Sequence, residues 1–305
     1  MADNYKLSED EINAVRSSAL KGDAESQNYL GMLYFSGAGV LKDEKRAFEL
    51  FLQAAESGLA AGALNVADCY ENGEGVKQDY DEAYKWYQKA ADLGSPEAQG
   101  SVGLFYEFGH VVDKNMEKAA EMYKLAVEGG SIGANYHLGR YYRAKGDNEN
   151  AFKYFLKAAE NGVGDSAYEV ARYYGNGWGV EKNEEESINW YAKAISTGNK
   201  DAEFELGNCY FEGRGVEKDL EMATRLFAAA AQQGHIQAAI NLGKCQDAGV
   251  DFEKMMADEE QTQAEAKALA AKKAEEEAAA GLSPECAIGI KFREQYEAQQ
   301  KNKNN

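Results

Sequence analysis

Apolar and small residues recur along the chain with the spacing of helices, and glycines interrupt them at regular intervals. In one such stretch, Ala83, Trp86, Tyr87, Ala90 and Ala91 follow at spacings of three, four, seven and eight residues, which places them on one helix face. The stretch before it carries a second apolar stripe, and a glycine turn joins the two. This pattern predicts a helical hairpin whose two apolar faces must both be buried.

The hairpin recurs in a constant register. A tyrosine marks the end of each first helical stretch, at Tyr34, Tyr70, Tyr106, Tyr142, Tyr174 and Tyr210. A glycine closes each second stretch, at Gly22, Gly58, Gly94, Gly130, Gly162, Gly198 and Gly234. Both markers advance by 36 residues except for one step of 32, so two unrelated features define the same repeat. Because a lone hairpin cannot bury both apolar faces, we expect the units to stack into an α-solenoid.

Four segments follow from this register. Residues 1–22 are expected to form a tail and a capping helix, because the last part of them looks like the second half of a unit. Residues 23–250 are expected to form the repeat solenoid. Residues 251–280 are rich in Ala, Glu and Lys and predict one long charged helix, and residues 281–305 predict a C-terminal segment with a disordered end.

The sixth unit carries the fullest version of the pattern. It contains Ala202, Leu206, Gly207, Tyr210, Gly213, Gly215, Val216, Asp219, Ala223, Leu226, Ala230, Ala231 and Gly234. These residues resemble the Sel-1-like repeat, a relative of the tetratricopeptide repeat, and the resemblance covers roughly residues 8 to 250. It implies an all-α fold, a right-handed α-solenoid of about six to seven helical hairpins. It also implies the general role of an adaptor or scaffold that binds a peptide or partner protein.

Two units depart from the pattern. Val111 stands where the third unit should have its second turn glycine. The fourth unit lacks four residues and the whole G-x-G-V turn, which should locally change how its neighbours stack. We interpret the missing residues as a tolerated loop deletion, and the alternative is a bend that serves a function.

The charge and the first residues narrow the classes of partner. The formal net charge is −19, so the surface should repel nucleic acid and anionic lipid. The first residues are acidic where a secretory signal needs a basic and then an apolar stretch, and no run is long enough to span a membrane. We therefore expect a cytoplasmic protein with a protein or peptide partner, and neither nucleic acid nor membrane as a partner.

No motif predicts an enzyme, a cofactor or a metal site. The G-x-G turns follow helices and recur once per repeat, whereas phosphate-binding loops follow a strand. Zinc-binding spacing is absent among the three histidines, His110, His137 and His235. Three of the four cysteines share one repeat position and are expected to be small core residues, namely Cys69, Cys209 and Cys245.

The resemblance also implies where a partner would bind. In tetratricopeptide-like solenoids the first helix of each hairpin lines the concave surface. In the middle units this register predicts a partner-binding surface of Tyr136, Arg140, Arg143, Tyr168, Arg172, Phe204, Asn208 and Phe211. Three arginines beside aromatic rings favour a groove for a carboxylate-bearing peptide. The alternative is that the rings pack between helices and the arginines pair with Glu169 or Glu205.

Two other functions stay open besides the adaptor. The chain could be a structural or regulatory subunit that uses residues 251–280 to form a homo-oligomer or to dock, rather than to cap the last hairpin. It could also be a hydrolase related to cysteine-rich repeat proteins, although it lacks their paired cysteines and an S-x-x-K signature.

Overall fold

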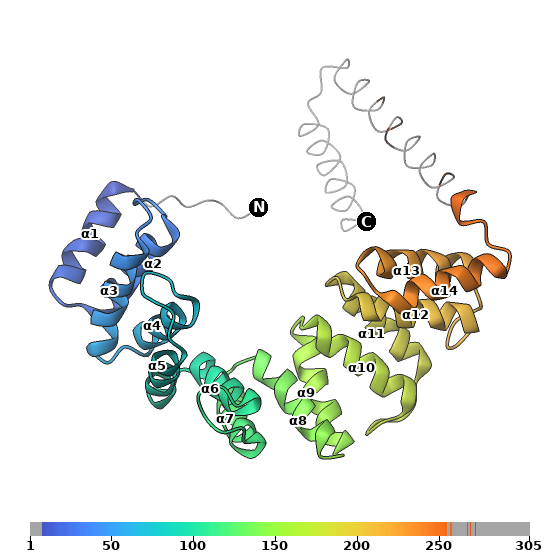
Figure 1. Cartoon of the computed structure of the whole chain (residues 1–305), viewed down its shortest axis with the longest axis horizontal. Coiled ribbons are helices and arrows are strands. Elements are labelled where there is room, and N and C mark those ends of the chain that lie inside the picture. The colour runs from blue at the N-terminus through green and yellow to red at the C-terminus, as the bar shows by residue number, and fades with distance from the viewer. Residues whose placement is uncertain (1–7, 255–256, 258–266, 268, 270–271, 273–305) are drawn as a thin grey trace, which may run out of the picture.

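The chain forms a row of helices. The computed structural model describes residues 8–254 and the single residues 257, 267, 269 and 272. In this part, fourteen α-helices follow one another along an open arc and no strand occurs (Figure 1), so the predicted all-α solenoid is confirmed. The helices are α1 (Glu9–Leu20), α2 (Ala24–Ser36), α3 (Glu44–Glu56), α4 (Ala60–Asn72), α5 (Tyr80–Asp92), α6 (Pro96–Phe108), α7 (Met116–Glu128), α8 (Gly133–Ala144), α9 (Asn148–Glu160), α10 (Gly164–Asn176), α11 (Glu184–Ser196), α12 (Lys200–Glu212), α13 (Leu220–Gln232) and α14 (Ile236–Asp247).

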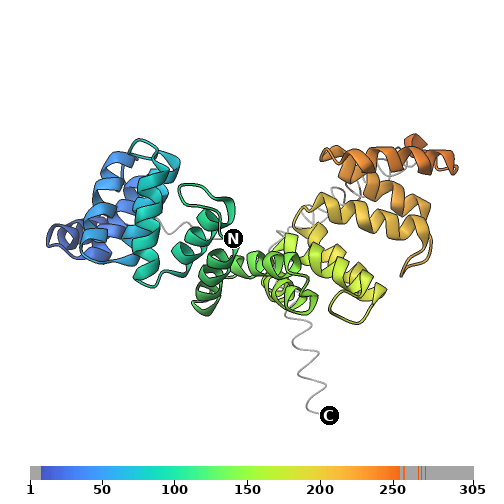
Figure 2. The same ribbon diagram turned by 60° about the horizontal axis from the view of Figure 1, so that its bottom comes forward.

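Six helical hairpins form the repeat units. An even-numbered first helix pairs with the odd-numbered second helix that follows it, from α2 with α3 to α12 with α13. Each second helix also packs against the first helix of the next unit, while α1 packs on α2 and α14 packs on α13. Apolar contacts therefore continue from unit to unit. Figure 2 shows that the arc also twists, so that its middle and its two ends lie at different levels.

An aromatic ring in the middle of each second helix is a constant feature of the units. The six rings, all buried, are Phe51, Tyr87, Tyr123, Phe155, Tyr191 and Phe227. The facing register position of the first helix holds only glycine or alanine, at Gly31, Ala67, Gly103, Gly139, Ala171 and Gly207. A Cβ atom added at Gly139 would lie 2.5 Å from Cδ1 of Phe155. The small residue therefore allows the two helices of a unit to approach closely.

A backbone hydrogen bond closes each hairpin at the base of its turn. The N-cap residue of the second helix donates its amide to the carbonyl of the repeat tyrosine, at 2.8–3.0 Å, in the pairs Asp43 to Tyr34, Asp79 to Tyr70, Asn115 to Tyr106, Asp147 to Tyr142, Asn183 to Tyr174 and Asp219 to Tyr210. The same residue caps its helix, as Asp147 Oδ1 accepts a hydrogen bond from the amide of Asn150 at 3.1 Å. The fourth unit keeps this closure despite its shorter turn. That explains how the loop deletion is tolerated.

The glycine that closes each unit has the backbone conformation that the sequence predicts. Gly162 has a φ of 87° and Gly198 a φ of 83°, in the left-handed region that glycine adopts without strain. The chain can therefore leave one hairpin and enter the next within three or four residues.

The predicted charged helix of residues 251–280 and the segment 281–305 lie, apart from a few residues, outside the described part of the chain. Their proposed roles in docking or self-association stay predictions. Among the described residues, no helix has both the length and the apolar character that a membrane crossing requires.

We predict that Gly139→Ala lowers the free energy of unfolding by about 1–3 kcal/mol, because the added methyl group would collide with the ring of Phe155. Gly133→Ala is the matched control in the same helix, since the space around its Cβ is open. It should leave the stability unchanged or raise it slightly, because alanine favours helix over glycine. Urea unfolding followed by circular dichroism measures both, and equal stabilities of the two variants would contradict the prediction.

Candidate functional site

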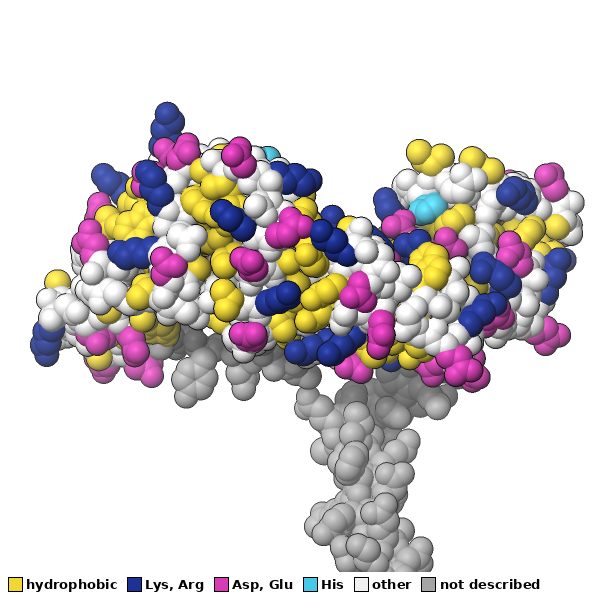
Figure 3. Space-filling view, turned by 90° about the horizontal axis from the view of Figure 1, so that it is seen from below, with side chains coloured by type: hydrophobic (Ala, Val, Ile, Leu, Met, Phe, Trp, Pro, Cys, Tyr) yellow, Lys and Arg dark blue, Asp and Glu magenta, His cyan; other side chains and the backbone are white. Residues whose placement is uncertain are grey.

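The first helices of successive units present a continuous surface, which we call the first-helix face. Side chains from the last turn of one first helix reach the middle of the next one, as Arg143 of α8 reaches Glu169 of α10. Figure 1 shows α2 and α4 on the inner side of the arc and α8 below α9, so this face winds around the superhelix. In the view from below, acidic and basic side chains lie interspersed among hydrophobic ones (Figure 3).

Glu107, in α6, is a buried carboxylate that contacts three side chains. Its Oε2 atom accepts a hydrogen bond from the Tyr123 hydroxyl at 2.6 Å and lies 3.2 Å from Nδ1 of His137. Its Oε1 atom lies 2.9 Å from Nη1 of Arg140. Burial alone would raise the pKa of Glu107, but the hydrogen bonds with His137 and Tyr123 and the charge of Arg140 lower this pKa to about 2. Glu107 is therefore ionised at neutral pH, and Arg140 compensates its charge.

Glu169, in α10, joins two of the predicted arginines. Nη1 of Arg143 lies 2.6 Å from Oε1 of Glu169, and Nη1 of Arg172 lies 3.2 Å from Oε2. The pairing with Glu169 that was the alternative to an open groove is thus present. Two guanidinium groups share this one carboxylate, however, and the Arg143 and Arg172 side chains are 39% and 33% exposed. Several of their N–H donors remain available to a ligand.

A pocket of about 410 Å³ opens beside this pair, and we call it the basic pocket. Its lining is Arg143, Asn148, Glu169, Arg172, Tyr173 and Trp178. The guanidinium carbon of Arg172 lies 5.5 Å from the ring centre of Trp178 and 5.6 Å from that of Tyr168, so two aromatic rings hold this arginine in place. The hydroxyl of Tyr173 is buried and has no hydrogen-bond partner in the described protein. The pocket therefore combines cationic donors with an unsatisfied hydroxyl.

The other predicted residues fall into two groups. Arg140 stacks over Tyr136 at 5.8 Å, next to the basic pocket along the first-helix face. The three residues of α12 lie on the first-helix face of the sixth unit, where they are half-buried and also contribute to packing. The ring of Phe204 packs on Phe227 and stacks on His235, Phe211 packs on Phe227, and Asn208 accepts a hydrogen bond from Asn241 at 2.9 Å.

Two features of the site were not predicted from the sequence. Trp178 lies between two turn glycines, where the other units with this turn have a small residue, a charged residue or a histidine. A tryptophan at this exposed position could have identified Trp178 as a candidate site residue. Glu107 carried no such signal, because its three contacts come from two other helices and depend on how the units stack.

The cysteines lie in the core, as predicted. Cys69, Cys209 and Cys245 are buried free thiols. Burial raises the pKa of the Cys69 thiol to about 12 and that of Cys209 to about 11, which is opposite to the shift that a nucleophilic thiol needs. Within the described residues, no group of three or more His, Cys, Asp or Glu side chains is arranged to hold a metal ion.

The fold defines a helical repeat protein of stacked hairpins. The Sel1 repeat family model matches six consecutive units, at residues 24–59, 60–95, 96–131, 132–163, 164–199 and 200–235. These matches cover more than half of the chain, so the protein belongs to the Sel1 repeat family. Proteins of this family are generally scaffolds for protein interactions, and they are typically not enzymes.

Solved structures with similar folds agree with this assignment. The protective antigen c5321 of uropathogenic Escherichia coli strains is 33% identical with a TM-score of 0.73, and the match covers 79% of this chain and 52% of that one. A Sel1 repeat protein from Oxalobacter formigenes is 28% identical with a TM-score of 0.64, covering 73% of this chain and 99% of that one. The present chain thus spans about half the length of the Escherichia coli antigen. No curated protein matches the sequence.

We predict that Glu107→Gln lowers the free energy of unfolding at pH 7 by roughly 2 kcal/mol, because hydrogen bonds to a buried charge are lost. In the wild type, the pKa of Glu107 falls from its ordinary 4.5 to about 2 on folding. Its stabilisation is therefore complete above about pH 5 and is lost as the pH falls towards 2.

The measurement is the urea midpoint between pH 7 and pH 2, which should fall more steeply for the wild type than for the variant. Glu117→Gln is the control, because Glu117 is an exposed partner of Lys145. Parallel curves for the wild type and Glu107→Gln would contradict the assigned role of Glu107.

Proposed function

We propose that this protein is an interaction scaffold that binds a carboxylate-bearing segment of a partner protein in the basic pocket. The observation that carries the proposal is the sharing of one buried carboxylate, Glu169, by Arg143 and Arg172 beside the unpartnered hydroxyl of Tyr173. An incoming carboxylate would supply the second negative charge for the two arginines.

The geometry of the pocket suits a side-chain or terminal carboxylate of a peptide. A guanidinium group binds a carboxylate through two parallel N–H donors, and Arg172 is restrained between Tyr168 and Trp178 before any ligand arrives. Because the Arg172 side chain is already restrained, it loses less conformational entropy when a ligand binds. The exposed ring of Trp178 adds apolar contact area at the rim of the pocket.

The remaining alternatives receive less support. The three free cysteines suit a reducing compartment, which supports the proposed cytoplasmic location. No observation on the described residues favours a hydrolase. The described part of the chain gives no observation that supports a role of residues 251–280 in oligomerisation.

We predict that Arg172→Gln weakens the binding of acidic peptides by about tenfold, because a charge-assisted pair is lost. Arg143 remains in this variant to pair with Glu169, so the free energy of unfolding should change little. The measurement is fluorescence anisotropy with labelled synthetic peptide pools that contain two fixed Asp or Glu residues among randomised positions.

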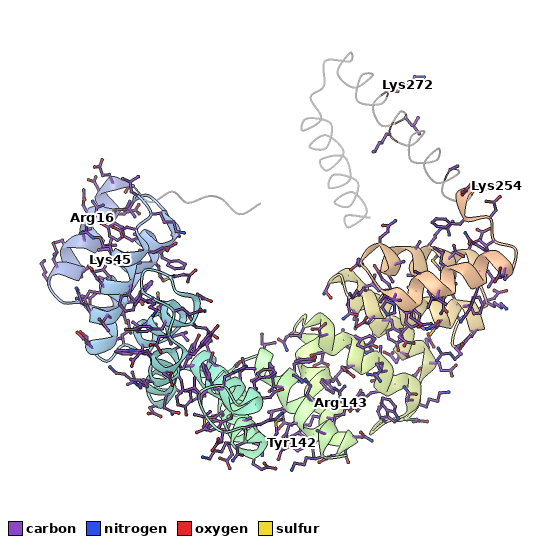
Figure 4. The ribbon with its side chains drawn as sticks, in the orientation of Figure 1. Arg16, Lys45, Tyr142, Arg143, Lys254 and Lys272 are labelled. Carbon is purple, nitrogen blue, oxygen red and sulfur yellow. The ribbon has the colours of Figure 1, made fainter. Side chains whose placement is uncertain are left out.

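The control is the double variant Arg16→Gln with Lys45→Gln, which removes more positive charge at the N-terminal end of the solenoid, whereas Arg143 lies near the middle of the arc (Figure 4). It should bind the acidic pools as the wild type does. Equal losses in Arg172→Gln and in this control would show a general effect of charge and would overturn the proposal.

A further inference from the structure

A second pocket lies on the same surface, between the second and third units, and we call it the apolar pocket. It has a volume of about 500 Å³ and is lined by Glu71, Tyr80, Leu104, Phe105, Phe108, His110 and Val111. Three of its apolar side chains are open to solvent, since Tyr80, Phe108 and Val111 are 49%, 55% and 44% exposed. The lining offers contact to a large apolar side chain.

Val111 adds an apolar side chain to the lining of this pocket. In the other units that have this turn the equivalent residue is glycine, and a Cβ atom there would lie 2.1 Å from the Glu44 carbonyl oxygen at Gly75 and 2.3 Å from that of Asn148 at Gly179. Those turns therefore rest against the start of the preceding second helix. Val111 adopts the same left-handed region, with a φ of 66°, but its side chain prevents that approach. The third unit therefore has a residue with a strained backbone in this turn, beside the pocket.

The apolar pocket has a negatively charged rim. Glu71 lines it, and the hydroxyl of Tyr87 donates to both Glu71 and Asp68, at 2.6 Å in the case of Asp68. No Lys, Arg or His side chain within residues 8–254 forms an ion pair with either carboxylate. Burial raises the pKa of Asp68, the hydrogen bond from Tyr87 lowers it, and the charge of Glu71 raises it again, with a net increase. A cation from a partner would relieve this repulsion.

The two pockets are equivalent in register. Glu71 corresponds to Arg143, Tyr80 to Asn148, Leu104 to Arg172, Phe105 to Tyr173, and His110 to Trp178. The same pocket therefore occurs twice in the solenoid, two units apart. One copy is lined by arginines, and the other by apolar side chains and a glutamate. Packed helix axes are roughly 10 Å apart and each unit adds at least one such distance, so two units correspond to on the order of 20 Å or more. At least about six extended residues span that distance.

We propose that the apolar pocket binds a large apolar side chain next to a Lys or Arg of the same partner segment whose carboxylate occupies the basic pocket. The acidic rim selects the cation, the exposed rings contact the apolar side chain, and the distance between the pockets sets the spacing of the two elements. This inference rests on the proposed function for the acidic element only, because the apolar pocket has its own lining and charge.

The test uses three labelled synthetic peptide pools with the full chain. The first carries Leu-Lys and Glu-Glu, in both orders, separated by four to eight Gly or Ser residues. The second has Ser-Ser in place of Leu-Lys, and the third has Ser-Ser in place of Glu-Glu. The variants are Phe108→Ser and Glu71→Gln for the apolar pocket, Arg172→Gln for the basic pocket, and Leu41→Ser as the control, because Leu41 is 90% exposed in the turn of the first unit.

On the wild type, the two-element pool should bind about tenfold more tightly than the acid-only pool. Phe108→Ser and Glu71→Gln should remove this advantage and leave the binding of the acid-only pool unchanged, whereas Leu41→Ser should change neither. Equal binding of the two-element and acid-only pools to the wild type would overturn the inference and leave the proposed function standing. Binding of the Leu-Lys pool that is lost in Phe108→Ser, together with acid-only binding that Arg172→Gln leaves unchanged, would support the role of the apolar pocket and overturn the proposed function.

Discussion

The packing of one aromatic ring on one small residue is the constraint on which the rest of the structure depends. It fixes the distance between the two helices in each unit, as Phe155 on Gly139 shows. Once that distance is constant, the end of one first helix always meets the middle of the next at the same place. Cavities then recur at the same register positions, and the side chains at those positions alone decide what each cavity can bind.

The fold was predictable because the repeated tyrosine and glycine in the sequence each have a structural role in the hairpin. The repeat tyrosine is the residue whose carbonyl closes the hairpin, as Tyr142 does with the amide of Asp147. The closing glycine is the residue that takes the left-handed conformation, as Gly162 does. The sequence period therefore predicted the contacts that form within one unit. The shortened fourth turn did not disturb the prediction, because the closing hydrogen bond lies below the deleted residues.

The site was predictable only in part, since its contacts cross between units. Register placed Arg143 and Arg172 on one surface, and their pairing with Glu169 was foreseen as an alternative. The free hydroxyl of Tyr173 and the position of Trp178 over Arg172 depend on side-chain directions that no spacing reveals. The rings of α12 are half-buried and pack on Phe227, as Tyr136 packs on Phe155, and register alone does not reveal how much of each ring such packing leaves exposed.

The contact between Arg143 and Glu169 also ties α8 to α10, and thus one unit to the next. A ligand carboxylate bound there as proposed would share Arg143 with Glu169, and its binding would redistribute a tether between two stacked hairpins. Small changes in the angle at one junction are magnified at the ends of a long arc. If the basic pocket binds a partner as proposed, binding at the middle of the arc would be mechanically coupled to its curvature and would alter the separation of the two ends.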